Sequence, residues 1–142
     1  MQTDKSCELS SAPPEILARE AVKVLLEKKG IDVKLYDVRE SGSITDFYII
    51  ATGRSLTHVA ALADDMCMLL AERGRTEERI EGKRGNSWIL VDYLDVIVNI
   101  FDKEAREFYN FERLLDSKNL VNIDNLIVEV DNKFDTNKNQ RI

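Results

Sequence analysis

The sequence predicts an α/β protein in which helices flank one mixed, five-stranded sheet. Segments with apolar residues at helical spacing alternate along the chain with short β-branched segments, as in proteins that cover a sheet with helices. One segment, Ser87 to Phe101 (SWILVDYLDVIVNIF), carries two adjacent apolar runs and supplies two central strands. The length of 142 residues fits a single domain with one core.

The first half of the chain predicts a helix, two strands and a second helix. Pro13 and Pro14 suit a first helical turn, and Gly30 ends that helix. Residues 33–38 (VKLYDV) and 45–52 (TDFYIIAT) have the composition of strands. The second helix is the clearest element, because its apolar residues recur at helical spacing: Val59, Leu62, Ala63, Met66, Leu69 and Leu70.

The second half predicts three strands and a last helix. Residues 75–81 (RTEERIE) are polar, as exposed edge strands are. The strands on either side of Asp92 to Asp95 follow, and residues 103–116 form a helix. Strands joined by short links must be antiparallel, whereas the strand–helix–strand passage over 45–81 permits a parallel neighbour. The apolar side of the last helix comprises Phe108, Phe111, Leu114 and Leu115, at helical offsets from Ala105.

The chain divides into three parts by composition. Residues 1–12 are polar and form a flexible tail, residues 13–116 form the domain, and residues 117–142 form a partly disordered C-terminal extension rich in Asn and Asp. Within that extension, residues 126–130 are a candidate for one further strand, and residues 131–142 are expected to fray.

The two apolar runs predict a β-hairpin with Tyr93 and Leu94 as its two-residue loop. Because side chains alternate along a strand, one face is wholly aliphatic and the other is mixed. The aliphatic face carries Ile89, Val91, Val96, Val98 and Ile100. The mixed face carries the cross-strand pairs Asp92–Asp95, Leu90–Ile97 and Trp88–Asn99.

The mixed face has two interpretations. A tryptophan with two aliphatic residues and two carboxylates is typical of a protein–protein contact. A helix or the C-terminal segment covering this face is an equally good interpretation, since monomers rarely expose large apolar patches. For Asp92 and Asp95 we favour a turn role, in which aspartate caps its own backbone, over an acid–base pair.

Other polar motifs give no catalytic or metal site. Gly53-Arg54-Ser55 lies between a strand and a helix, the position of a phosphate loop, but with one glycine it fits helix capping by Ser55 better. His58, the single histidine, has no cysteine beside it and is interpreted as a surface residue.

Charge and composition indicate the compartment and the kind of partner. With 20 basic and 26 acidic residues the net charge is −6, which disfavours broad nucleic-acid binding and favours a basic protein partner. No apolar run is long enough for a membrane helix, and the N-terminal residues lack an apolar signal segment, so we expect a cytoplasmic protein. Cys7 and Cys67 have no metal-binding spacing and are expected to be free thiols.

Three sequence blocks keep a common order and spacing: DVRESGSITDFYIIATGRS, then IEG followed by WILVDYLDVIVNIF, then REFYNFERLL. Together they resemble the ribosomal silencing factor family, also called RsfS or Iojap, over residues 13–116. The resemblance implies a mixed-sheet α/β fold related in topology to nucleotidyltransferases but without enzymatic activity, cofactor or metal.

The resemblance also implies a partner and a site. Family members bind the large ribosomal subunit through a basic ribosomal protein, the one commonly numbered fourteen, where the small subunit would dock. Occupying that surface blocks subunit joining and represses translation. The site residues implied by the family are Asp46, Glu81, Trp88, Asp92, Tyr93, Asp95, Arg106, Tyr109 and Glu112, and the mixed face adds Leu90 and Asn99.

Three positions depart from the family pattern. Asn99 stands where histidine is usual, Leu94 where glycine is usual, and Asp116 follows Leu115 where tryptophan is usual. Two other functions stay open. One is a metal-dependent nucleotidyltransferase-like enzyme using Asp92 and Asp95, and the other is a homodimer that buries the mixed face about a two-fold axis.

Overall fold

The computed structural model describes residues 8–140, with side chains up to Phe134, and confirms the predicted α/β class. The helices are α1 (Pro14–Glu27), α2 (Leu56–Glu72), α3 (Lys103–Tyr109) and α4 (Asp124–Gln140), with 3₁₀ turns at Phe111–Leu114 and Ser117–Asn119. The strands are β1 (Ile31–Asp37), β2 (Phe47–Gly53), β3 (Arg79–Glu81), β4 (Trp88–Asp92), β5 (Val96–Asp102) and β6 (Leu120–Val121).

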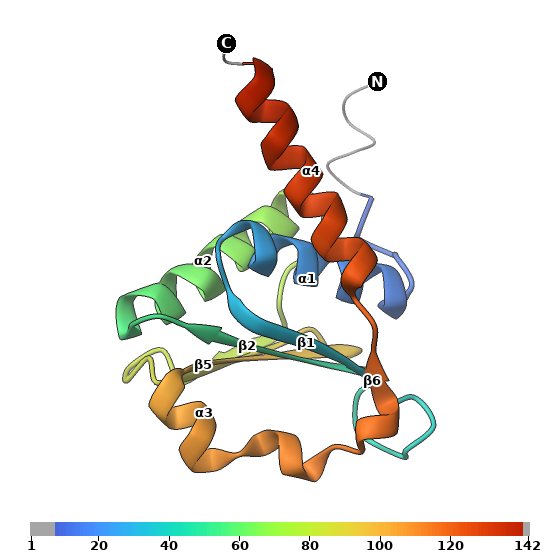
Figure 1. Ribbon diagram of the computed structural model, residues 1–142. Helices are drawn as coiled ribbons and strands as arrows, with labels where there is room; N and C mark the ends of the chain where they lie inside the picture. The colour runs from blue at the N-terminus through green and yellow to red at the C-terminus, as the bar shows by residue number, and fades with distance from the viewer. Residues whose placement is uncertain (1–7, 141–142) are drawn as a thin grey trace.

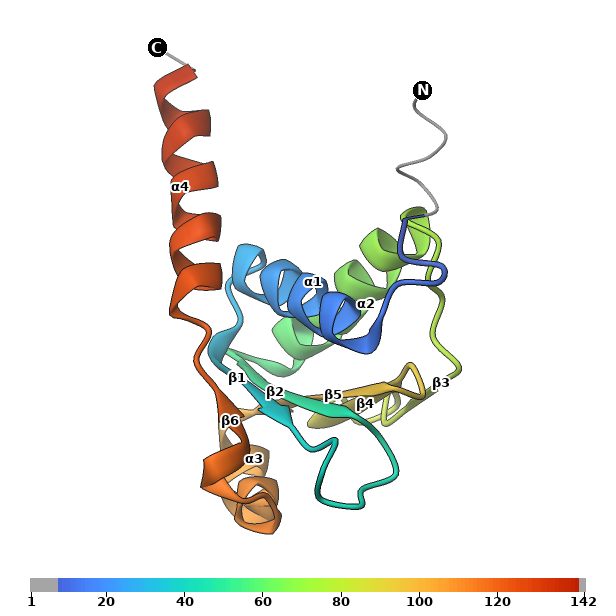
Figure 2. The same ribbon diagram turned by 90° about the vertical axis from the view of Figure 1, so that its right-hand side faces the viewer.

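All six strands form one sheet, in the order β3-β4-β5-β2-β1-β6, so the prediction of five strands is one short. Helices α1 and α2 cover one face, and α3 with the 3₁₀ turns covers the other (Figure 1). Helix α4 projects away from the rest of the molecule (Figure 2). No helix in the described part of the chain has the length and apolar character needed to cross a membrane.

Strands β2 and β5 pair in parallel, while every other neighbouring pair is antiparallel. A parallel pair needs a crossover, and here the chain passes through α2 and the β3–β4 strands before it returns as β5. The carboxyl ends of β2 and β5 therefore meet at one edge, at Gly53 and Asp102. Helices α2 and α3 both begin just beyond that edge.

The two faces of the sheet carry cores of different size. The larger core joins the aliphatic face of β2, β4 and β5 to α1 and α2, as the alternation of residues 89–100 predicts. The smaller core lies under α3, around Phe101, Ile50 and Tyr36, and Trp88 and Phe111 pack against it. This smaller core is the one that borders the predicted site.

The ends of the fold differ from the sequence prediction. Part of the expected N-terminal tail is packed, because Leu9 is buried and its N–H donates to the Arg73 carbonyl at 2.8 Å. The prediction of a strand at residues 126–130 is wrong, since these residues lie in α4. Residues 131–140 continue that helix rather than fraying.

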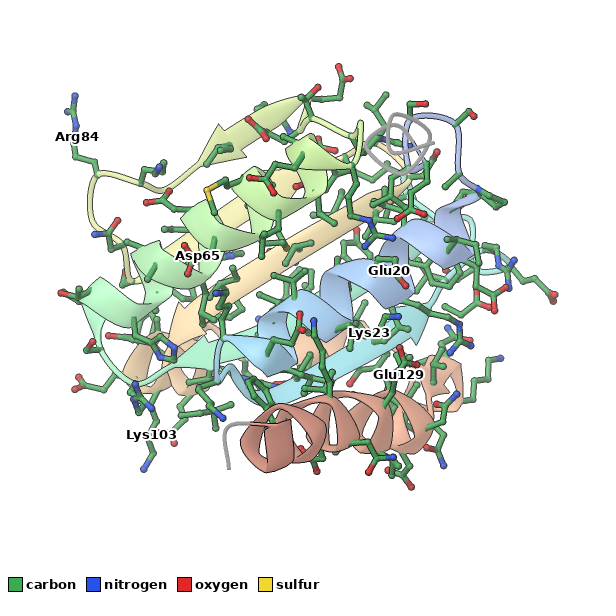
Figure 3. All side chains as sticks on the ribbon, turned by 90° about the horizontal axis from the view of Figure 1, so that it is seen from above. Glu20, Lys23, Asp65, Arg84, Lys103 and Glu129 are labelled. Atoms are coloured by element: carbon green, nitrogen blue, oxygen red, sulfur yellow. The ribbon has the colours of Figure 1, made fainter. Side chains whose placement is uncertain are left out.

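Helix α4 forms because its apolar residues recur at helical spacing, with Leu126 and Val130 buried. Lys23 of α1 joins Glu20 at 2.7 Å and Glu129 of α4 at 2.8 Å, and these three side chains meet where the two helices lie side by side (Figure 3). The C-terminal segment is thereby held against α1.

The helix predicted over residues 103–116 is shorter than expected. Asn110 adopts the left-handed conformation (φ 46°, ψ 51°), which asparagine tolerates, so α3 ends at Tyr109 and a 3₁₀ turn follows. After the break, Phe111 and Leu115 pack against the smaller core. Phe108, which was predicted among the apolar residues of the helix, is exposed, because α3 buries Ala105 and Arg106 instead.

Candidate interaction surface

The β4–β5 hairpin turns one residue later than predicted. Tyr93 still belongs to the ladder, its N–H donating to the Val96 carbonyl at 2.9 Å, and the loop consists of Leu94 and Asp95. The observed pairs are Asp92–Ile97, Leu90–Asn99 and Trp88–Phe101. Because this register differs from the predicted one by two residues on β5, the alternation of faces is kept. Asp95 moves into the loop, and Phe101 takes the place opposite Trp88.

Trp88 is partly covered by the molecule's own aromatic residues. Its ring lies 4.9 Å from the rings of both Phe101 and Tyr109, and its indole Nε1 donates to Asn99 Oδ1 at 3.0 Å. Helix α3 thus shields one side of Trp88 without burying it fully. The interpretation in which the molecule covers this face itself therefore holds for one part of it, and the other part stays accessible.

The accessible part of the face continues from Trp88 onto α3. Phe108 is 81% exposed and packs edge to face against Tyr109, with ring centroids 5.1 Å apart. On the other side of Trp88, Leu90 is partly exposed and pairs with the exposed Glu81 of edge strand β3. We call this set the aromatic surface: Glu81, Trp88, Leu90, Asp92, Phe108 and Tyr109.

Arg79 organises the charges of the aromatic surface. Its guanidinium lies 3.0 Å from Glu81 and 3.4 Å from Asp92. Asp92 also accepts a hydrogen bond from the Leu94 N–H at 2.7 Å, which confirms its predicted turn role. Asp95 lies instead 3.9 Å from Arg75. The two aspartates therefore have separate partners, and the surface keeps a net negative charge.

Three residues predicted to bind the partner have buried side chains: Tyr93, Asn99 and Arg106. Tyr93 points into the larger core, where its hydroxyl lies 3.8 Å from the Cys67 Sγ, and burial raises the pKa of Tyr93. Burial also raises the pKa of the Cys67 thiol to about 11, and Cys67 is free as predicted. Asn99 is buried beneath Trp88 and Leu90, with no described partner for its Nδ2.

Arg106 is also buried and acts as a link between α3 and the sheet. Its guanidinium holds both carboxylate oxygens of Glu112, at 3.0 and 3.1 Å, and donates to the Thr52 Oγ1 at 2.8 Å. Lys34 lies 3.1 Å from the same carboxylate. The hydrogen bond from Arg106, assisted by Lys34, lowers the pKa of Glu112. This pair fixes the turn that carries Phe111 against Trp88.

Asp46 lies away from the aromatic surface. Its backbone N–H donates to the Asp95 carbonyl at 3.0 Å, at the end of β5 opposite to the one that contacts Trp88. Apart from the buried Tyr93, Asn99 and Arg106 and the Glu112 that pairs with Arg106, the predicted site residues fall into two groups. Glu81, Trp88, Leu90, Asp92 and Tyr109 lie at one surface, and Asp46 and Asp95 lie at the hairpin loop.

Two residues outside the predicted site also have defined roles. Ser55 caps α2 as predicted, accepting from the His58 N–H at 3.1 Å. His58 is more than a surface residue, because its ring bonds the Arg54 N–H at 2.9 Å and the Lys28 carbonyl at 3.0 Å, joining the start of α2 to the end of α1. The prediction for Cys7 lies outside the described residues.

The sequence matches one protein family over nearly its whole length. The family model described as "Ribosomal silencing factor during starvation" matches residues 10–141. The ribosomal silencing factor of Haemophilus influenzae is 42% identical over 86 residues, which cover 61% of this chain and 84% of that protein. The one from Halalkalibacterium halodurans is 32% identical over 107 residues, 75% of this chain and 92% of that protein.

More distant relatives and a solved structure agree. A mouse protein named "Mitochondrial assembly of ribosomal large subunit protein 1" is 27% identical over 96 residues. The matched residues make up 66% of this chain but only 42% of that longer protein. A crystal structure of a protein from Chromobacterium violaceum superposes with a TM-score of 0.70 at 31% identity, covering 72% of this chain and 86% of that one.

Proposed function

Because the chain belongs to the ribosomal silencing factor family, we propose that it binds the large ribosomal subunit in the cytoplasm and prevents the small subunit from joining. Binding alone is sufficient for this effect, so the protein makes and breaks no bond. The bacterial relatives are named as silencing factors, and the mouse relative is named for assembly of the large subunit. Those names support a ribosomal partner.

The observation that carries the proposal is the exposed Phe108–Tyr109 pair beside the half-covered Trp88. Aromatic residues that are exposed but held rigidly by their neighbours are favourable anchors, because they lose little side-chain entropy on binding. Arg106 and Glu112 hold the following turn and so keep these aromatic rings in position. The aromatic surface therefore has the rigidity that a docking site needs.

The proposed contact on the ribosome is a basic ribosomal protein at the subunit interface. Glu81 and Asp92 lie at the margin of the aromatic surface, and the whole chain has a net charge of −6. That charge attracts a basic protein and weakens direct contact with RNA phosphates. Asp46 and Asp95, at the hairpin loop, extend the acidic margin.

Sedimentation of purified ribosomal particles tests the proposal. The protein is expected to travel with isolated large subunits and to be absent from small subunits and from joined ribosomes. Joined ribosomes serve as the internal control, because the proposed contact surface is covered in them. Equal binding to large subunits and joined ribosomes would contradict the proposed site.

The same exposed aromatic pair also favours self-association. Phe108 and Tyr109 would be buried if two copies met about a two-fold axis, and such a dimer would compete with ribosome binding. Light scattering of the free protein over a range of concentrations measures this. A mass that rises toward twice that of the chain, and that falls in Phe108→Ala, is the expected signature of a dimer through this surface.

A further inference from the structure

A cavity of about 570 Å³ opens at the edge where the parallel strands β2 and β5 end. Its walls come from the start of β1, the end of β2 with Arg54 just beyond it, and α3 with the turn that follows. Ligands of open α/β sheets bind at the carboxyl ends of parallel strands, where the following segments separate. The cavity shares no residue with the aromatic surface, although Arg106 and Glu112, which line it, are among the predicted site residues.

Gly53 is required for the shape of this edge. A Cβ at this position would lie 2.8 Å from the backbone nitrogen of Val59, closer than side chains tolerate. The end of β2 can therefore run directly beneath the first turn of α2. This close approach places Arg54 at the cavity wall.

Two cations at the cavity have no ion-pair partner among the described side chains. Arg106 is neutralised by Glu112, and it also approaches Asp32 at 3.4 Å. The side chains of Arg54 and Lys103, by contrast, enter no ion pair in the described part of the chain. Lys103 lies at the end of the molecule at which α2 begins (Figure 3). Two unpaired cations lining one cavity suit a doubly charged anion such as a phosphate group.

The rest of the cavity differs from a simple anion site. Asp32 and Glu107 place carboxylates on its wall, and these accept hydrogen bonds from hydroxyl groups but repel a second anion. The exposed side chain of Ile31 adds an apolar patch. A ligand that fits these residues combines a phosphate group, hydroxyl groups and an apolar group.

We propose that this cavity binds a nucleoside phosphate. The phosphate lies between Arg54 and Lys103, the ribose hydroxyls donate to Asp32 or Glu107, and the base lies against Ile31. A volume of about 570 Å³ falls within the range of small-molecule sites. The cavity shares no residue with the aromatic surface, but it borders α3, which carries Phe108 and Tyr109. Binding of a small nucleotide there would therefore influence the segment that begins at α3.

Calorimetric titration of the full chain tests the site. Each of the four nucleoside monophosphates is compared with the matching nucleoside and with inorganic phosphate. We expect at least one monophosphate to bind about tenfold or more tightly than either of its parts. Equal affinity for the monophosphate and for inorganic phosphate would overturn the nucleotide assignment, and so would a lack of binding at millimolar concentration.

Two double variants locate the binding. Arg54→Ala with Lys103→Ala removes the cations of the cavity, and it is expected to weaken monophosphate binding about tenfold or more. The control, Arg84→Ala with Lys118→Ala, removes the same charge from exposed positions outside the cavity. Equal weakening in both would show a nonspecific charge effect and overturn the site. Tighter binding of a short RNA than of any mononucleotide, lost in the first variant, would overturn the assignment to a free nucleotide.

Discussion

Trp88 and Asn99 are joined across β4 and β5 by a hydrogen bond of 3.0 Å from the indole Nε1 to the amide Oδ1. This bond supports Trp88 from below, while Tyr109 packs on it from α3. Asn99 is buried, and its Nδ2 has no described partner. Trp88 therefore packs over a buried amide group whose N–H donors have no described hydrogen-bond partner. A charged side chain at position 99 would be poorly solvated there and would lower the stability of the fold.

The isosteric change Asn99→Asp tests the buried environment. The carboxylate keeps the acceptor for Trp88 but places a charge in the smaller core, so we expect a loss of about 2 kcal/mol or more in unfolding free energy at pH 7. Burial raises the pKa of such an aspartate, so the loss shrinks as pH falls and the group protonates. Urea unfolding, followed by the fluorescence of the single tryptophan, measures both. A loss no larger than that of the exposed Asn132→Asp would contradict this account.

Glu112 makes the attachment of the 3₁₀ turn dependent on acid. Arg106 lowers the pKa of Glu112 in the folded protein, so this stabilisation is present above the ordinary glutamate pKa of about 4.3 and is lost as pH falls below it. Glu112→Gln is expected to cost about 2 kcal/mol at pH 7, because it leaves the buried Arg106 with only the exposed carboxylate of Asp32, at 3.4 Å, as a charged partner. The stability difference between the two proteins should vanish in acid. If the difference in unfolding free energy between the two proteins stays constant down to pH 3, the ion pair between Arg106 and Glu112 contributes no stability.

Leu94 adopts a left-handed backbone conformation, with φ of 74°. This conformation costs a branched L-residue roughly 1 kcal/mol or more, and glycine is free of the penalty. We therefore expect Leu94→Gly to raise the unfolding free energy by about 1 kcal/mol, as measured by urea unfolding. Leu114→Gly, at a similarly exposed site in a 3₁₀ turn, is the control and should lower it. Destabilisation by both changes would contradict the claim that the backbone of Leu94 is strained.

Helix α4 is held by a narrow apolar contact with α1. Leu126 is buried, whereas Val128 faces solvent two residues later. Leu126→Ala is expected to cost about 3 kcal/mol, because it leaves a cavity in the larger core. Val128→Ala should change the unfolding free energy by less than about 0.5 kcal/mol. Thermal unfolding of both variants measures this, and equal melting temperatures would mean that α4 does not dock in solution.

Elements with long helical or strand patterns could be predicted from the sequence, because their signals are local. The apolar spacing of α2 and the alternation through β4 and β5 are examples. Residues 126–130 were ambiguous, since a short β-branched run suits either a strand or a buried helix face. Strand β6, with two residues, is too short to leave a pattern.

The site was predictable in part, because the face of a strand follows from alternation alone. Trp88 and Leu90 share one face of β4 as expected, although the hairpin register was wrong by two residues on β5. The pairing of Glu81 with Leu90 was not predicted. Phe108 was missed as a site residue because the sequence does not show that α3 turns Ala105 and Arg106, rather than Phe108, toward the sheet. The burial of Arg106 depends on contacts with residues distant in sequence, which no local pattern reveals.

Subunit joining, followed by light scattering, tests the central claim most directly. Adding the protein to large subunits before small ones should abolish the rise in scattering, and Phe108→Ala should need about 30-fold more protein for the same effect, equivalent to about 2 kcal/mol. Met68→Ala, which removes an apolar side chain 52% exposed on α2, is the control and should inhibit like the unmodified protein. Undiminished joining at saturating protein, or equal inhibition by all three proteins, would contradict the aromatic surface as the ribosome-binding site.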